Sequence, residues 1–147
     1  METNKQIVLD ANILMRAVLG KKVKPLLEKH YADVQFFTPR VCYQDAKKYL
    51  PPLFKKKNLE ERDAIEALDE LMSLVNILDA SVYCLYAIES KQRIAIRDVD
   101  DWPVVAAAMM LNCPIWTEDA DFFGAGVATW TSDRVHLYLS SWEQCEQ

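Results

Sequence analysis

The sequence contains few of the residues that mark low-complexity chains or zinc-binding modules. Only three of its 147 residues are glycine, and its four cysteines (Cys42, Cys84, Cys113 and Cys145) are widely spaced, with no Cys-x-x-Cys pair. The scarcity of glycine argues against low complexity, and the cysteine spacing does not fit a zinc cluster. We therefore expect free thiols in a reducing compartment.

Long apolar runs are missing as well. No stretch reaches the roughly 20 residues that span a bilayer, and no basic segment followed by an apolar one opens the chain. We therefore expect a soluble, cytoplasmic protein without membrane contact. With no internal repeat, no linker rich in Gly, Pro or Ser, and 51% apolar residues, residues 1–147 are expected to form a single domain.

An excess of positive charge is also absent, since the net charge is −5. This value is a sum over the whole chain. A site built from several carboxylates accounts for much of it, and bound cations would reverse the sign of the charge locally. The net charge therefore does not exclude a polyanionic substrate.

Short apolar segments alternate with helical patterns, which favours an α/β fold with a mainly parallel, twisted sheet covered by helices. Pro51–Pro52 should end one helix, and Thr38, Asn58 and Ser81 should cap the starts of others. The predicted strands are 6–10, 34–37, 113–116, 127–130 and 135–139, with a brief strand or turn at 76–79. The predicted helices are 11–19, 21–31, 38–50, 59–75, 81–93 and 101–112.

Acidic residues stand at the ends of apolar segments in three places. Asp10 ends the first predicted strand, Asp101 precedes an apolar helix, and Asp119 follows the strand at 113–116. Because the carboxyl ends of parallel strands meet at one edge of a sheet, these acids can converge. Clustered carboxylates repel one another unless a proton or a cation lies among them, and hard divalent cations prefer oxygen ligands. The pattern therefore predicts a metal-dependent enzyme.

Each acid also has an ordinary structural interpretation. Asp10 is a good helix cap, one of the three acids just before Pro103 is expected to cap the next helix, and Asp119 and Asp121 suit a turn. Three acids before one helix exceed what capping requires, and Asp101 lies closest to its start. The ordered set of three groups, rather than any single acid, favours a site.

The set resembles the PIN domain family, in particular its VapC-like toxin group of endoribonucleases. The resemblance rests on Val8–Asn12, Asp101–Ala106 and Thr117–Phe122, whose order and spacing fit the family over nearly the whole chain. It implies a PIN-like three-layer α/β sandwich around a mainly parallel sheet. It also implies one or two Mg²⁺ or Mn²⁺ ions as cofactors. The implied metal ligands are Asp10, Asp101 and Asp119, and the implied supporting residues are Asn12, Thr117 and Asp121.

The family usually adds a glutamate from the helix after the second strand. This chain has Gln44 and Asp45 there, with no glutamate at either position. Asp45 is the better candidate for the fourth catalytic ligand, although its side chain is shorter. If Gln44 fills the position instead, metal affinity or activity would be reduced.

The resemblance further implies hydrolysis of single-stranded RNA by a toxin, expected as a homodimer with a small antitoxin protein as its partner. The alternative is a non-catalytic PIN-like module that binds RNA or protein. A phosphoryl-transfer protein of receiver or haloacid-dehalogenase type is disfavoured, because Asp10-Ala-Asn12 lacks the second acid of the nucleophile motif.

Basic residues around the helix that carries Asp45 are candidates for contacts with the RNA backbone. An equally good interpretation is a solvated lysine face. The candidates are Arg40, Lys47, Lys48, Lys55, Lys56 and Lys57.

Overall fold

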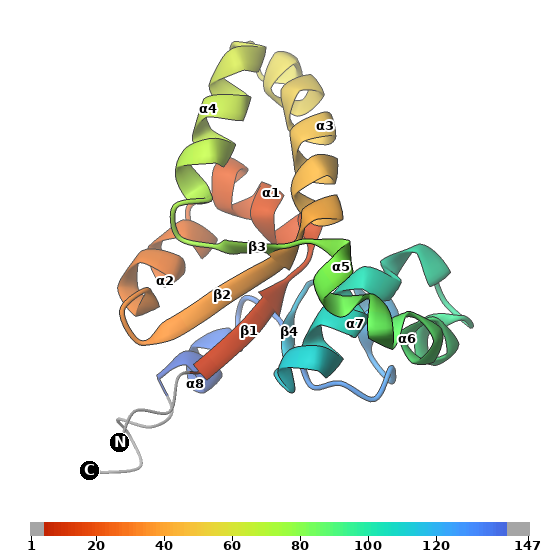
Figure 1. The fold of residues 1–147 in the computed structure, drawn as a ribbon. Helices are drawn as coiled ribbons and strands as arrows, with labels where there is room; N and C mark the ends of the chain where they lie inside the picture. The colour runs from red at the N-terminus through yellow and green to blue at the C-terminus, as the bar shows by residue number, and fades with distance from the viewer. Residues whose placement is uncertain (1–4, 141–147) are drawn as a thin grey trace.

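The protein, described by a computed structural model over residues 5–140, is built on a five-stranded, all-parallel sheet in the order β3-β2-β1-β4-β5. β1 lies at its centre, between β2 and β4, and the β1 and β2 arrows in Figure 1 point the same way. The strands are β1 (Lys5–Leu9), β2 (Val34–Pro39), β3 (Asn76–Leu78), β4 (Ile115–Trp116) and β5 (Thr129–Trp130).

Helices cover the sheet on both faces. In Figure 1, α1, α3 and α4 pack together above the sheet, whereas α5, α6 and α7 lie to its right, with α7 against β1, β2 and β4. The predicted α/β sandwich is thus confirmed. The helices are α1 (Ala11–Leu19), α2 (Val23–His30), α3 (Arg40–Lys56), α4 (Glu61–Leu71), α5 (Ala80–Tyr83), α6 (Ala87–Ile94), α7 (Trp102–Leu111) and α8 (Val135–Leu139), with 3₁₀ turns η1 (Cys84–Tyr86), η2 (Val99–Asp101) and η3 (Ala120–Phe122).

The core explains why β1 and α7 carry uninterrupted apolar runs. Residues 7–9 of β1 and 104–108 of α7 are buried, as expected for a strand covered on both faces and for a helix packed directly onto it. Three consecutive alanines in α7 let its backbone approach the sheet closely. β1 ends directly before Asp10, and α7 begins directly after Asp101, so these two buried elements position both acids.

Helix α3 does not end at Pro51–Pro52, as the sequence predicted, but continues to Lys56. The prolines lack the N–H groups that would bond the carbonyls of Lys47 and Lys48, which lie on the exposed side of the helix. On the opposite side, Leu50 and Phe54 are buried. Their packing outweighs the lost helical hydrogen bonds.

The predicted caps at Asn58 and Ser81 are wrong. Asn58 has a φ of 61° and forms a left-handed turn, and α4 begins only at Glu61, with Glu60 at its N-cap position. Ser81 lies inside α5, which starts after Asp79, and the single helix predicted for 81–93 is divided into α5, η1 and α6. Local capping preferences therefore did not set where α4 and α5 begin.

The strand predicted at 135–139 is also wrong, because these residues form helix α8. Its apolar residues alternate, but only Val135 and Leu139, four positions apart, are buried. In five residues, alternation cannot be distinguished from one face of a helix. The Tyr138 hydroxyl donates to the Gln6 carbonyl (2.8 Å) and joins α8 to β1.

The expectations on thiols and membrane segments can be compared with residues 5–140. Cys42, Cys84 and Cys113 are free thiols, as expected, and Cys145 lies outside the described residues. No helix in this part of the chain is both long and apolar enough to cross a membrane.

Thr38 is not the predicted cap of α3. It lies in β2, fully buried, and its hydroxyl donates to the Leu9 carbonyl at 2.8 Å. Because Thr38→Val keeps the shape but removes this donor from a buried carbonyl, we expect it to lower the free energy of unfolding by about 1 to 2 kcal/mol in urea titrations. Thr129→Val in the half-buried edge strand is the matched control. Equal losses in both variants would contradict the role given to Thr38.

Candidate metal centre and active site

Asp10 is both a helix cap and a link between strands. One carboxylate oxygen accepts the Ile13 N–H of α1 at 3.0 Å, and the other accepts the Thr117 hydroxyl just after β4. The side chain is only 5% exposed. The hydrogen bond to Thr117 therefore joins the first and third predicted motifs, which are 107 positions apart, at the carboxyl ends of β1 and β4.

The loop after β4 is shaped by its own polar side chains. The Thr117 hydroxyl accepts the Asp119 N–H at 2.9 Å, and the Asp119 carboxylate accepts the Asp121 N–H at 2.9 Å. On the neighbouring segment, Asp98 accepts the Asp100 N–H at 3.0 Å and caps η2, which ends at Asp101. These local bonds fix the direction in which the carboxylates leave the backbone.

Three carboxylates converge. Asp101, Asp119 and Asp121 each offer one oxygen, and these oxygens all lie within 4.8 Å of one another. Oδ2 of Asp101 is buried and has no hydrogen-bond partner. Octahedral ligands at about 2.0–2.1 Å from Mg²⁺ are about 3.0 Å apart when adjacent and about 4.2 Å apart when opposite. A small side-chain adjustment would let this cluster hold a divalent ion, and the unpartnered oxygen fits that role.

Asp101 and Asp119 of this cluster line a small cavity of about 100 Å³ at the carboxyl edge of the sheet. Every charged side chain on its lining is acidic, so the cavity has no positive charge of its own. Its polar lining consists of Asp10, Asn12, Cys42, Asp45, Asp100, Asp101 and Asp119.

Burial and mutual repulsion disfavour the charged forms of two of these acids. Burial raises the pKa of Asp10 to about 6, against the hydrogen bonds from Thr117 and Ile13. Burial also raises the pKa of Asp101 to about 7, and the negative charges of Asp98 and Asp119 add to this. Both acids therefore keep a proton to higher pH than an exposed aspartate does, and a bound cation would favour their charged forms.

The structure separates the two candidates for the fourth acidic position. Both side chains are exposed, but Asp45 lines the cavity and Gln44 is not part of the lining. With α3 starting at Arg40, Val41 and Asp45 stand one turn apart on the side that faces the cavity. This geometry favours Asp45 as the candidate ligand.

Other predicted residues are placed differently from the expectation. Asp121, expected only as support, belongs to the converging set, whereas Asp10 lines the cavity with both oxygens already hydrogen-bonded. Asn12 lines the cavity and is exposed. Which of these acids bind the metal remains a prediction.

Sequence reasoning missed Asp100 and Cys42 as lining residues. Asp100 was one of the acids before Pro103, and nothing in the spacing distinguished it from a cap. Cys42 lies three positions before Asp45 on the same helix face, a signal that could have placed it. Burial, followed by the nearby Asp10 charge, raises the pKa of its thiol, so it is not a reactive thiolate.

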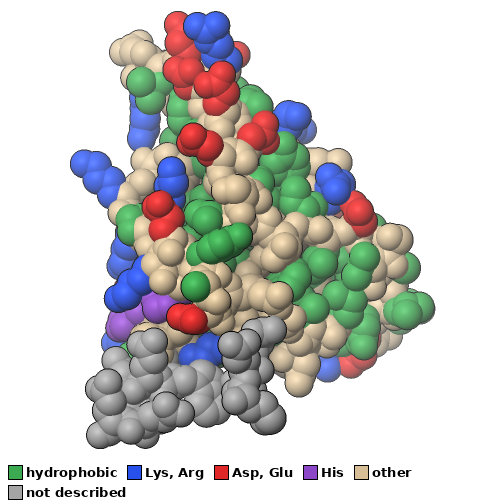
Figure 2. All heavy atoms as spheres, turned by 60° about the vertical axis from the view of Figure 1, so that its left-hand side comes forward, with side chains coloured by type: hydrophobic (Ala, Val, Ile, Leu, Met, Phe, Trp, Pro, Cys, Tyr) green, Lys and Arg blue, Asp and Glu red, His purple; other side chains and the backbone are tan. Residues whose placement is uncertain are grey.

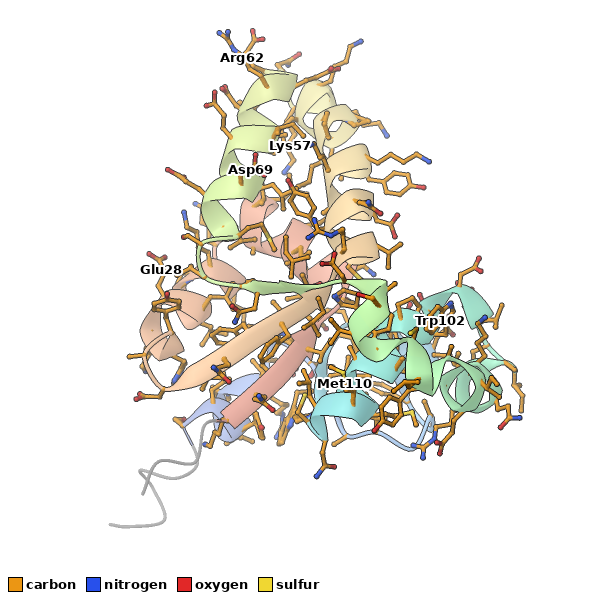
Figure 3. The ribbon with its side chains drawn as sticks, viewed as in Figure 1. Glu28, Lys57, Arg62, Asp69, Trp102 and Met110 are labelled. Atoms are coloured by element: carbon orange, nitrogen blue, oxygen red, sulfur yellow. The ribbon has the colours of Figure 1, made fainter. Side chains whose placement is uncertain are left out.

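The basic candidates on α3 spread along the helix. Arg40 forms an ion pair with Asp79. Lys55–Lys57 lie about ten residues beyond Asp45, or about 15 Å along the axis, toward the outer end where Figure 3 shows Arg62. In Figure 2, Asp and Glu gather on the upper part of the face and Lys and Arg follow its left edge. Phosphate contacts by Arg40, Lys47, Lys48 and Lys55–Lys57 remain a prediction.

Comparison with known proteins agrees with this geometry. The family model of the PIN domain matches residues 8–140. The chain therefore belongs to the PIN domain family. Proteins of this family are nucleases that use divalent metal ions, and the cluster of Asp101, Asp119 and Asp121 could bind one. No curated protein sequence is a significant match to the chain.

Solved structures share the fold at low sequence identity. A chain in the crystal structure of VapBC2 from Rickettsia felis bound to a DNA fragment from their promoter is 16% identical, with a TM-score of 0.69 over 86% of this chain and 98% of that one. FitAcB from Neisseria gonorrhoeae gives 21% identity and a TM-score of 0.61 over 86% and 97%. VapBC-1 from nontypeable Haemophilus influenzae gives 15% and 0.63 over 88% and 99%.

The raised pKa values predict how the stability of the metal-free protein changes with pH. Because the folded-state pKa of Asp10 (about 6) and Asp101 (about 7) lie above the value of 3.8 for an exposed aspartate, the folded protein binds more protons between these limits. The free energy of unfolding should therefore fall as pH rises from about 4 to about 7. The buried Asp10 should contribute about 3 kcal/mol to this fall. Solvent screens the half-exposed Asp101 and reduces its contribution.

Urea titrations in EDTA at several pH values measure the profile of the free energy of unfolding against pH. Asp101→Asn should flatten the profile and stabilise the protein at pH 8, because it removes one of the repelling charges. The exposed acid in Asp33→Asn provides the control and should leave the profile as it is. A stability that rises between pH 5 and pH 8 would contradict the electrostatic account.

Proposed function

We propose that the protein is a metal-dependent endoribonuclease that hydrolyses phosphodiester bonds of single-stranded RNA. The observation that carries this proposal is the convergence of Asp101, Asp119 and Asp121, with one buried oxygen of Asp101 lacking a hydrogen-bond partner, in a chain with the PIN fold. Clustered carboxylates repel one another, and a cation bound among them would relieve that repulsion.

The proposal gives the acidic residues different roles at the metal site. Asp101, Asp119 and Asp121 would hold one Mg²⁺ or Mn²⁺, and Asp10 and Asp45 would shape the charge around it or bind a second ion. Such ions supply positive charge to the scissile phosphate and activate a water for in-line attack. The carboxylates act as ligands and form no covalent bond to the substrate.

We further propose a toxin role, with a small antitoxin protein as partner, a homodimeric state and a cytoplasmic location. Support comes from the similar structures, which include VapBC complexes and a toxin–antitoxin complex from Klebsiella pneumoniae at 19% identity and a TM-score of 0.58. Co-expression with the product of an adjacent small gene, followed by co-purification, is the direct test of this partner.

Cleavage by the purified protein decides between the nuclease and a non-catalytic binding module. We expect cleavage of an unstructured oligoribonucleotide with Mg²⁺ or Mn²⁺ and none with EDTA. Removing a direct ligand by Asp101→Asn should lower kcat by at least about 100-fold, since losing even an indirect metal partner typically costs 10- to 100-fold. Asp33→Asn is the control. If the wild-type protein binds RNA but cleaves it with neither metal, the non-catalytic module is correct.

A matched pair of variants tests which residue fills the fourth acidic position. Asp45 lines the cavity and its neighbour Gln44 does not, so Asp45→Ala should weaken Mn²⁺ binding by about 10- to 100-fold, whereas Gln44→Ala should change it by less than about 2-fold. Titration calorimetry measures both affinities. A larger loss in the Gln44 variant would reverse the assignment.

A further inference from the structure

A second and larger cavity adjoins the acidic one. Its volume is about 530 Å³, and Asn12 and Asp119 line both cavities. The two spaces are therefore neighbours on either side of these two side chains. The larger cavity lies between the outer face of α1, the loop that leads into α2, and the loops that follow β4 and β5.

The difference in size determines what each cavity can hold. At about 100 Å³, the acidic cavity is much the smaller of the two and suits ions, waters and a phosphate oxygen. At about 530 Å³, the second cavity falls within the range of about 300–1,000 Å³ typical of small-molecule sites.

One stripe of helix α1 forms the wall that joins the two cavities. Asn12, Met15, Arg16 and Leu19 stand at helical spacing on the same face and all line the larger cavity. The stripe starts two residues after Asp10 and ends beside the loop at Gly20. A ligand lying along it would extend from the acidic cavity toward the end of α1.

The lining combines an apolar wall with a cluster of cations. Met15, Leu19 and Val23 supply apolar surface, and Arg16, Lys21 and Lys22 supply positive charge. This composition is the opposite of that in the neighbouring cavity, where every charge is negative. An apolar surface beside cations suits a nucleotide, with its base on the first and its phosphate near the second.

The lining carries three cations against two acids, Glu118 and Asp119, so one formal positive charge remains in excess. Glu118 accepts the Ser132 N–H at 2.6 Å, and the Ser132 hydroxyl in turn accepts the Trp116 indole N–H at 3.0 Å. Glu118 is thus held by the loop behind it. Asp119 belongs to the cluster that can hold a cation.

We propose that this cavity is the binding site for the nucleotide adjacent to the scissile phosphate, with Arg16, Lys21 and Lys22 contacting its phosphate and Met15 and Leu19 its base. The proposal rests on the proposed nuclease function and adds to it the path of the RNA. The strand runs from the acidic cavity along α1 toward the start of α2, and away from the outer end of α3.

The test compares two double variants that lose the same charge. Lys21→Ala/Lys22→Ala removes two cations from the cavity, and Lys29→Ala/Arg62→Ala removes two exposed cations elsewhere. Arg16→Gln is an independent second variant in case the double variant folds poorly, as judged by its melting temperature. Cleavage of a fluorescent oligoribonucleotide gives kcat and KM at several salt concentrations, and anisotropy in EDTA gives the affinity for the same uncleaved RNA.

We expect the cavity variants to raise KM and the dissociation constant by about 10-fold, with a much smaller effect on kcat, because their side chains no longer reach the phosphates. The slope of log affinity against log salt should fall by about 0.7 for each phosphate that the protein no longer neutralises. The control should change KM by less than about 2-fold, since its cations touch no part of this path.

The outcomes separate the two proposals. Wild-type cleavage together with cavity variants that match the control would overturn the nucleotide site and leave the nuclease function standing. Equal losses in the cavity and control variants would also overturn it, because they would indicate a general charge effect. If the wild type does not cleave RNA but the cavity variants lose RNA affinity selectively, the nuclease function fails and the binding site is retained.

Discussion

The mutual repulsion of carboxylates at the carboxyl edge of the sheet is the constraint on which the site depends. Asp119 and Asp121 share the loop after β4, and the fold brings Asp101 from a distant segment so that oxygens of all three lie within 4.8 Å. The Thr117 hydroxyl donates to Asp10, joins the ends of β1 and β4, and stabilises one of the neighbouring charges. Since burial raises the pKa of Asp101 to about 7, the folded chain tolerates this cluster by protonation until a cation replaces the protons.

Capping and site chemistry are not alternatives in this protein. Asp10 caps α1 and Asp119 caps η3, yet both line the acidic cavity. A cap bond ties a carboxylate oxygen to backbone N–H groups and thereby fixes the direction of the side chain. For Asp119, the second oxygen is left to face the cavity. The same bond that begins a helix or turn therefore pre-orients a candidate ligand.

The sequence predicted the sheet, α1, α7 and the convergence of three acid groups, because parallel strands place their carboxyl ends together. It could not predict that α3 passes through Pro51–Pro52 or that 135–139 is helical, since packing of Phe54 and Leu139 decided both. Within the site, the position of Asp121 follows from a turn bond to Asp119, which spacing alone does not encode. Lys21 and Lys22 were predicted as part of a helix over 21–31, whereas α2 begins at Val23 and both lysines lie in the loop before it.

Charge is arranged locally in a way that the net value of −5 conceals. An acidic cavity by itself would repel RNA. A bound cation would offset this repulsion only over about one Debye length, which is about 8 Å at physiological salt. Phosphates on either side of the scissile bond lie near the limit of that distance. These phosphates would need other cations. Arg16, Lys21 and Lys22 line the cavity that shares Asn12 and Asp119 with the acidic one. In the proposed function, attraction of the RNA strand and its hydrolysis belong to adjacent cavities whose formal charges have opposite sign.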